Sequence, residues 1–163
     1  MKTLLFFRHG KSDWDADYHL DHERPLAKRG RKAAKKMGGF LAQANLIPDH
    51  VLCSTAVRAR STLEIAQEAG NWNTSVHLTP ALYHAAPSTL LREIRAQQMS
   101  TNILMLVGHE PTWSETIEHF IGGGLVRFPT AAMACIELDI ASWHNAALGQ
   151  GLLRWLVPPK ILS

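Results

Sequence analysis

Short apolar runs, separated by polar segments, predict the strands of this chain. The first run, residues 3–7, has the sequence Thr-Leu-Leu-Phe-Phe. Such a continuous run, bounded by polar residues, is typical of a strand that is buried on both faces. The clearest run of this kind is 103–107. The other predicted strands cover residues 51–53, 76–78, 132–138 and 152–157.

Between these runs, apolar residues recur at the spacing of a helix. The longest such segment is 25–46, in which Pro25 suits a first helical turn. Its predicted apolar face consists of Leu26, Ala33, Met37, Phe40, Leu41 and Ala44. Further helices are predicted at 55–69 (ended by Gly70), at 88–98, and at 111–121 (ended by glycines 122–124). Residues 10–24 are polar and predict a loop.

The alternation of strands and helices predicts an α/β fold with a largely parallel sheet covered on both faces. No internal repeat, low-complexity linker or composition change divides the chain. We therefore expect residues 1–163 to form a single domain.

The composition excludes several broad classes of protein. The 163 residues are 46% hydrophobic and 19% charged, which is ordinary globular usage and excludes bulk disorder, collagen and coiled coil. No apolar run approaches the roughly 18 residues of a membrane span. The apolar core of residues 1–9 is too short for a signal peptide and is followed at once by Arg8 and His9, so we expect a cytoplasmic location and no membrane. Cys53 and Cys135 both lie in apolar runs and predict buried, reduced thiols.

Two histidines stand directly after predicted strands. His9 follows the first strand, and His109 follows the clearest later strand. In an open parallel sheet, ligands bind beyond the carboxyl ends of the strands. We therefore expect both histidines at one site, with Gly10 and Gly108 in the tight turns that leave the two strands.

Two arginines are predicted at the same edge of the sheet. Arg8 precedes His9, and Arg58 lies in the first turn of the helix that follows strand 51–53. A helix N-terminus favours anions, and two guanidinium groups provide forked donors that fit phosphate oxygens. The pattern indicates a phosphate site.

Two arginines and two histidines can together perform phosphoryl transfer. A neutral histidine can attack phosphorus and hold a covalent intermediate, while its second ring nitrogen acts as a hydrogen-bond donor. A neighbouring guanidinium disfavours the imidazolium form and keeps the nucleophile neutral. This scheme requires neither a metal nor another cofactor. It predicts a fall in rate as acid protonates the histidine, between about pH 8 and 5.

The order and spacing of these residues resemble the histidine phosphatase superfamily, also called phosphoglycerate mutase-like. The matching segments are Arg8-His9-Gly10, Ser54-x-x-x-Arg58-Ala59-x-x-Thr62 and Gly108-His109, with Arg24-Pro25-Leu26 and Arg29-Gly30 similar to the opening of the family's first helix. The resemblance covers about residues 2–158. It implies that His9 becomes phosphorylated and that Arg8, Arg58 and His109 complete the phosphate pocket. It also implies a three-layer α/β/α sandwich around a mostly parallel sheet.

Within the superfamily, the chain is most similar to the SixA-type phosphohistidine phosphatases. The chain is short, Lys11 stands where sugar-phosphate mutases usually have Glu, and no large cap insertion follows the third strand. An open pocket implies a phosphorylated side chain of another protein as substrate, such as a phosphohistidine-bearing phosphotransfer protein. Lys11 and Ser12 are further candidate substrate-binding residues.

One departure from the family concerns the general acid. Mutases and many phosphatases of the family have Glu or Asp shortly after the third strand, whereas residues 82–87 contain no carboxylate. Mutase activity is therefore not expected. A phosphoramidate needs a positioned acid less, because its imidazole leaving group can take a proton from solvent. The candidate proton donors are Asp13, Asp15, Asp17, Asp21, Glu23 and His84.

Two other functions remain open on the sequence. One is a phosphomonoesterase of the same family that acts on a small metabolite. The other is a module that binds phosphate or protein without turnover, against which the intact set of four residues argues.

Several further features have ordinary explanations. Residues 28–36 contain six cations opposite the apolar face of their helix, which predicts a solvated face that can also steer an acidic partner protein. No aromatic residues alternate with these cations, so nucleic-acid binding is not expected. His19 and His22 lie in a loop without cysteine, so no metal site is predicted. Trp14 and Trp113 are candidates for the pocket rim.

Overall fold

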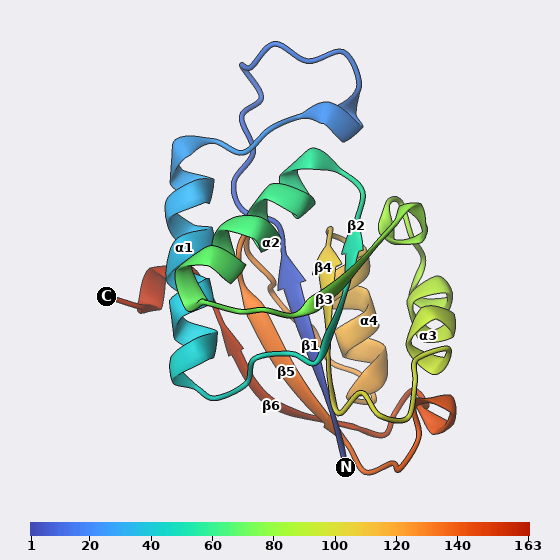
Figure 1. The fold of residues 1–163 in the computed structure, drawn as a ribbon. Coiled ribbons are helices and arrows are strands. Elements are labelled where there is room, and N and C mark those ends of the chain that lie inside the picture. The colour runs from blue at the N-terminus through green and yellow to red at the C-terminus, as the bar shows by residue number, and fades with distance from the viewer.

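The computed structural model describes residues 1–163 and contains one six-stranded sheet with helices on both faces (Figure 1). The strands are β1 (Lys2–Arg8), β2 (His50–Ser54), β3 (Ser75–Thr79), β4 (Ile103–Gly108), β5 (Met133–Leu138) and β6 (Gly151–Val157). The helices are α1 (Lys28–Gln43), α2 (Val57–Gly70), α3 (Pro87–Arg95) and α4 (Thr112–Phe120). All six predicted strands and all four predicted helices are confirmed.

The strands follow the order β3-β2-β4-β1-β5-β6 across the sheet. β1 pairs in parallel with β4, β4 with β2, and β2 with β3. β5 is antiparallel to both of its neighbours, so it alone runs against the other strands. The mostly parallel sheet of the predicted α/β/α sandwich is therefore confirmed.

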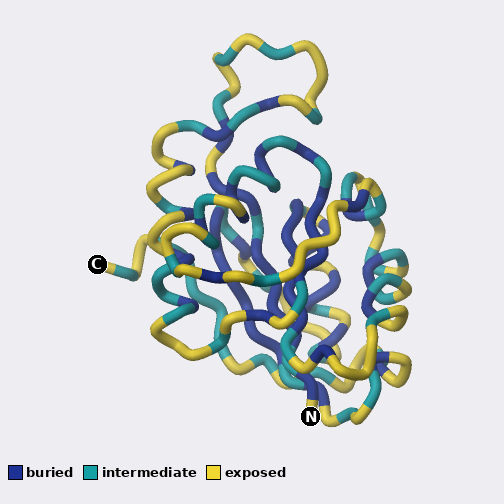
Figure 2. The backbone as a smooth tube through the Cα atoms, in the orientation of Figure 1, coloured by how far each residue is buried: buried dark blue, intermediate teal, exposed yellow.

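Side chains of β1 alternate between two separate hydrophobic cores. Leu4 and Phe6 join the core formed with α3 and α4, which includes Trp113. Leu5 and Phe7 join the core formed with α1 and α2. All four side chains are fully buried, which explains why a strand covered on both faces has a continuous apolar sequence. The central strands of the sheet accordingly have the dark blue of buried residues in Figure 2.

The first helix is shorter than predicted. It begins at Lys28 rather than Pro25, because Leu26 forms an isolated antiparallel bridge with Ser12 and the backbone N–H of Ala27 donates to the carbonyl of Lys11 (2.8 Å). It ends at Gln43, so Ala44 is exposed and does not belong to the apolar face. The pairing of the preceding loop thus overrides the helical start that Pro25 indicates.

The other boundaries differ from the prediction by at most three residues at either end. Gly70 is the last residue of α2, and the C-cap is Asn71, whose φ of 55° is left-handed, so Asn71 and not Gly70 is the residue that stops this helix. The glycines 122–124 follow α4 with positive φ values, as expected of a helix stop. Only residues 80–86 separate β3 from α3, so no large cap is inserted there.

Both cysteines are buried and free, as predicted. No helix of the structure combines the length and the apolar character that crossing a bilayer would require.

Two adjacent glycines of α1 provide a test of the packing between α1 and α2. A Cβ atom on Gly38 would lie 2.6 Å from the Cα of Ala66, whereas a Cβ on Gly39 would meet nothing within 4 Å. We expect Gly38→Ala to lower the free energy of unfolding by about 1–3 kcal/mol, because overpacking outweighs the gain in helix propensity. Gly39→Ala should instead raise it by about 0.5–1 kcal/mol. Urea unfolding of both variants measures this, and equal effects would contradict the close helix contact.

Candidate functional site

The carboxyl ends of β1, β4 and β2 lie side by side and bring the predicted residues to one edge of the sheet. His9 follows β1, and His109 follows β4, to which β1 is paired. The ring centroids of the two histidines are 5.2 Å apart. Arg58 lies in the first turn of α2, directly after β2. The parallel pairing thus produces the grouping that the sequence predicts.

His9 is a buried, neutral imidazole. Its Nδ1 lies 2.7 Å from the carbonyl oxygen of Gly10, which can only accept, so Nδ1 holds the proton and Nε2 has the free lone pair. Burial is the main cause that lowers the pKa of His9 to about 3. The hydrogen bond to Gly10 opposes this shift, and the positive charges of Arg58, Arg8 and Arg24 add to it. These features are those of a nitrogen nucleophile.

The loop after His9 is held against α2. The backbone N–H of Gly10 donates to Thr62 Oγ1 (2.9 Å), and the Thr62 hydroxyl donates to the carbonyl of Arg58 (2.7 Å). A Cβ atom on Gly10 would lie 2.7 Å from the carbonyl oxygen of Gly30 in α1. Gly10 is therefore needed for close backbone contact, and its φ is not positive. Gly108 is likewise needed because Trp113 packs directly against it.

His109 faces the site with an unpaired ring nitrogen. Its Nε2 lies 2.8 Å from the hydroxyl of Ser54, which also accepts from the backbone N–H of Ala56. A hydroxyl that donates its proton to Nε2 leaves the ring proton on Nδ1. Nδ1 is buried and has no partner, so in this tautomer it is free to donate to a phosphate oxygen. Burial, followed by the charge of His9, lowers the pKa of His109 to about 2.

Arg58 is anchored by Asp21 across the site. Its Nη1 donates to the backbone carbonyl of Asp21 (2.8 Å) and its Nη2 to the carboxylate (3.0 Å). The same carboxylate accepts from Arg24 (2.6 Å) and from the hydroxyl of Tyr83 (2.6 Å). The hydrogen bond from Tyr83 and the two arginines hold the pKa of Asp21 at about 2. Asp21 is therefore ionised at neutral pH and has no proton to donate, which removes it from the candidate acids.

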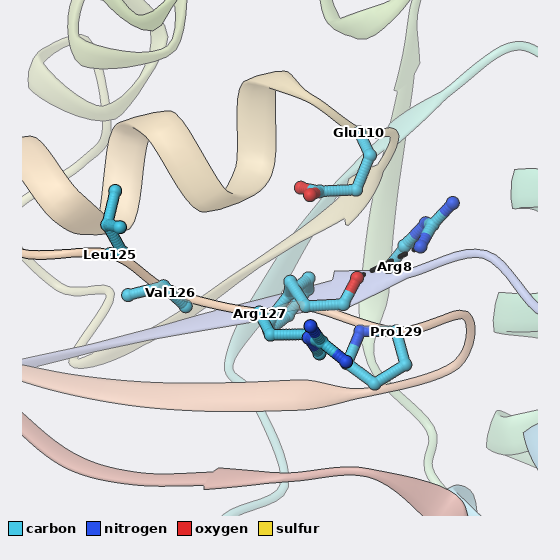
Figure 3. Close-up of a pocket in the computed structure, with 7 residues that line it drawn as sticks. Arg8, Glu110, Leu125, Val126, Arg127 and Pro129 are labelled. Atoms are coloured by element: carbon cyan, nitrogen blue, oxygen red, sulfur yellow. Dashed lines mark hydrogen bonds between the residues drawn. The ribbon is translucent and has the colours of Figure 1, made fainter.

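Arg8 lines a separate hollow beside the histidines. The hollow has a volume of about 610 Å³ and also contacts Glu110 and residues 125–129. The Nη1 of Arg8 donates to the carbonyl of Phe128 (2.9 Å), while its buried Nε has no partner. Figure 3 shows Arg8 beside Arg127 and Pro129, with Glu110 on the other side of the hollow. Arg8 is thus adjacent to His9 but is partly engaged by this loop.

A second hollow, of about 360 Å³, lies on the side of Arg58 and His109. Tyr83, His84 and Glu110 are among its lining residues. The carboxylate of Glu110 accepts from the backbone N–H and the hydroxyl of Ser114 at the start of α4 (2.7 and 2.8 Å). Of the candidate proton donors that the sequence offers, His84 lines this hollow and the others do not.

Lys11 and Ser12 lie at different depths in the loop. Lys11 is exposed, whereas Ser12 is buried and its hydroxyl accepts from Arg24 Nε (3.0 Å). Arg24 itself is buried and stacks over Trp14, 3.4 Å from the ring centroid. Arg24 was not predicted as a site residue, although the segment Arg24-Pro25-Leu26 already resembled the family. Trp113 is fully buried in the core and does not form the rim.

The structure contains no group of three or more His, Cys, Asp or Glu side chains that could hold a metal ion, so His19 and His22 do not belong to one. The Nε2 of His22 instead lies 2.8 Å from the hydroxyl of Thr55. Neither His19 nor His22 lines the hollow beside Arg8 or the hollow beside Arg58 and His109.

Comparison with known proteins agrees with this geometry. Residues 4–85 match the model of the histidine phosphatase superfamily (branch 1). The chain belongs to the histidine phosphatase superfamily. A Mycobacterium leprae protein of uncharacterised function is 34% identical over 153 residues, which cover 86% of this chain and 92% of that protein.

Solved structures place the chain in the SixA type of the superfamily. The candidate phosphohistidine phosphatase SixA of Agrobacterium tumefaciens is 29% identical, with a TM-score of 0.84 over 97% of this chain and 98% of that chain. The corresponding SixA protein of Nakamurella multipartitia is 26% identical, with a TM-score of 0.84 over 96% of both chains. Membership of this superfamily indicates that the chain is a phosphatase.

The neutral histidines predict how stability depends on pH. The folded-state pKa values of His9 (about 3) and His109 (about 2) lie below the ordinary histidine pKa of 6.5. At a pH between the folded-state value and 6.5, the unfolded chain therefore binds more protons than the folded chain. The free energy of unfolding should be highest above about pH 6.5 and fall by about 2 kcal/mol per histidine between about pH 6.5 and 5. Urea unfolding across this range measures the slope. His9→Gln should reduce it, and His144→Gln, at an exposed position, should not; an unchanged slope in His9→Gln would contradict the neutral form.

Proposed function

We propose that this chain removes phosphate from phosphohistidine on a protein, through a phosphorylated His9 and without a metal. The observation that supports the mechanism most directly is the bond from His9 Nδ1 to the Gly10 carbonyl (2.7 Å), which leaves Nε2 as a neutral nucleophile. The parallel strands bring His109 and Arg58 to the same edge, where they can bind the phosphoryl oxygens.

The proposed reaction has two steps. In the first, the Nε2 lone pair of His9 attacks phosphorus, a bond forms between Nε2 and phosphorus, and the P–N bond of the substrate breaks. The substrate imidazole keeps the bonding electrons and takes a proton from solvent. In the second step, the oxygen of a water molecule forms a bond to phosphorus and the bond between phosphorus and Nε2 breaks. Its electrons return to Nε2, which restores neutral His9, and inorganic phosphate leaves with the protons of the water.

The arginines and His109 have distinct roles in this scheme. Arg58 and Arg8 neutralise charge on the phosphoryl oxygens, and His109 donates from Nδ1.

Because the pKa of His9 is about 3, its protonation does not slow the first step at moderately acid pH. A histidine with an ordinary pKa would lose activity between about pH 8 and 5, as the sequence predicts. With the lowered pKa of His9, we expect the rate to fall only below about pH 5.

The choice of protein phosphohistidine as substrate rests on the leaving group and on access to the site. Asp21 is held as an anion by its hydrogen bonds, so it cannot protonate an alkoxide. An imidazole leaving group does not require such an acid. The short connection 80–86 leaves the hollow open to a side chain on a protein surface. Solved relatives named phosphohistidine phosphatase SixA support the same substrate class.

Phosphate release from a panel of substrates tests the proposal. The panel contains a protein phosphorylated on histidine and several small phosphate esters, each assayed with the wild type and with His9→Ala. We expect fast release from the protein only, and a loss of at least about a thousandfold in His9→Ala. Release mainly from small esters would keep the mechanism and replace the substrate by a small metabolite. No release from either would indicate a module that binds without turnover.

Chelation tests the metal-free mechanism separately. Activity should be unchanged after dialysis against EDTA, because the proposed charge neutralisation comes from arginine side chains. Dialysis against buffer alone is the control. Activity that disappears with EDTA and returns with added Mg²⁺ or Zn²⁺ would refute this part of the proposal.

A further inference from the structure

The outer face of α1 has six cations and no anion. The sequence of the helix, KRGRKAAKKMGGFLAQ, contains no acidic residue. All six cationic side chains belong to exposed residues. We call this surface the basic face of α1, and it consists of Lys28, Arg29, Arg31, Lys32, Lys35 and Lys36.

The rest of the chain leaves the basic face without counter-charges. The ion pairs of the structure involve Arg24, Arg58, Arg92 and Arg154, and none involves a cation of α1. Glu68 of α2 lines a hollow of about 430 Å³ together with cations of the basic face, but it forms no ion pair with them. The Nζ of Lys36 donates to the backbone carbonyl of Leu162 (3.0 Å), and the charge of the other five side chains faces solvent.

This arrangement works against the stability of the helix. Cations in the first turn oppose the helix dipole, which favours negative charge there. Lys28 and Lys32, and likewise Arg31 and Lys35, are four residues apart, so their like charges repel. The helix dipole and the repulsion between like charges thus both disfavour the basic face, whereas an external anion would relieve both effects.

The basic face begins beside His9. Gly30 packs closely against the loop after His9, because a Cβ atom on Gly30 would lie 2.8 Å from the backbone nitrogen of Lys11. The first turn of α1 is therefore adjacent to the site, and the helix runs from there toward the amino ends of the strands (Figure 1). From Lys28 to Lys36 the helix rises about 12 Å, which about four residues of extended chain would span.

We propose that the basic face of α1 docks an acidic surface of the phosphorylated protein substrate while its phosphohistidine reaches His9. This inference rests on the proposed function and adds the charge of the partner surface to it. A protein fits the face better than a nucleic acid, because no aromatic side chain lies among residues 28–36 to stack on bases. Attraction between opposite charges raises the rate of association and depends strongly on salt.

Two matched peptides test the proposal. Each contains one phosphohistidine, flanked by glutamates in the acidic peptide and by glutamines in its neutral twin. With the wild type at low salt, kcat/KM for the acidic peptide should exceed that for the neutral one by about tenfold, and this ratio should fall toward one as salt is added. The difference should lie in KM, since docking does not change the chemical step.

Charge reversal locates the effect on α1. Lys32→Glu/Lys35→Glu should abolish the preference for the acidic peptide and leave kcat for the neutral peptide unchanged. Arg92→Glu/Arg95→Glu is the control, because it changes the net charge equally at exposed positions of α3, in the opposite helical layer. It also removes the hydrogen bond from Arg95 Nε to the carbonyl of Ala146 (2.8 Å), so its activity is compared at a temperature at which thermal unfolding shows it to be folded. Thermal unfolding should show that the α1 variant is at least as stable as the wild type, since repulsion has been removed. An equal preference in wild type, variant and control would overturn the proposal.

Binding without turnover separates this inference from the proposed function. Fluorescence anisotropy with the acidic peptide that has plain histidine should show binding to the wild type and loss of binding in Lys32→Glu/Lys35→Glu. That result would support docking even if neither phosphopeptide were hydrolysed, which would refute the proposed function alone. If the peptide does not bind, the proposal is wrong. Tight binding of duplex DNA that the same variant abolishes would assign the face to a nucleic acid and also overturn it.

Discussion

The parallel pairing of β1 with β4, and of β4 with β2, is the constraint on which the site depends. Hydrogen bonds between parallel strands fix their register, with Arg8 opposite Gly108 and Cys53 opposite Val107. The residues that follow these strands are then held at one edge by a buried sheet and by two hydrophobic cores. The sheet thus holds the proposed nucleophile His9, His109 and the start of α2 in place, and such preorganisation would keep reorganisation during the proposed reaction small.

Burial of this edge determines the protonation of its histidines. A charged imidazole is disfavoured away from water, and the surrounding guanidinium groups disfavour it further. The Gly10 carbonyl then selects which nitrogen of His9 holds the proton. The same packing joins the site to α1, because Gly10 and Gly30 let two backbones meet. The proximity of the basic face to His9 is thus a consequence of the backbone contact between the loop after His9 and α1.

Asp21 shows how a charged residue can belong to a site without supplying its chemistry. Its carboxylate and backbone carbonyl accept hydrogen bonds from Arg58 of α2, and its carboxylate also accepts from Arg24 and Tyr83. These bonds connect the segment 21–24 with the start of α2 and with Tyr83 in the connection between β3 and α3. Held as an anion, it offsets positive charge in a pocket with several arginines. This arrangement limits the candidates for a proton donor and favours a substrate whose leaving group does not need one.

The sequence by itself determined the strands, the helices and the positions of His9, His109, Arg8 and Arg58 at strand or helix ends, because apolar periodicity reports local hydrogen bonding and burial. It did not determine the start of α1, where the bridge from Ser12 to Leu26 replaces a helical turn. The bond from Arg58 to Asp21, 37 residues away, also depended on the tertiary structure, as did the burial of Trp113 under Gly108. Such contacts join segments whose local patterns contain no information about each other, and only the packed fold brings them together.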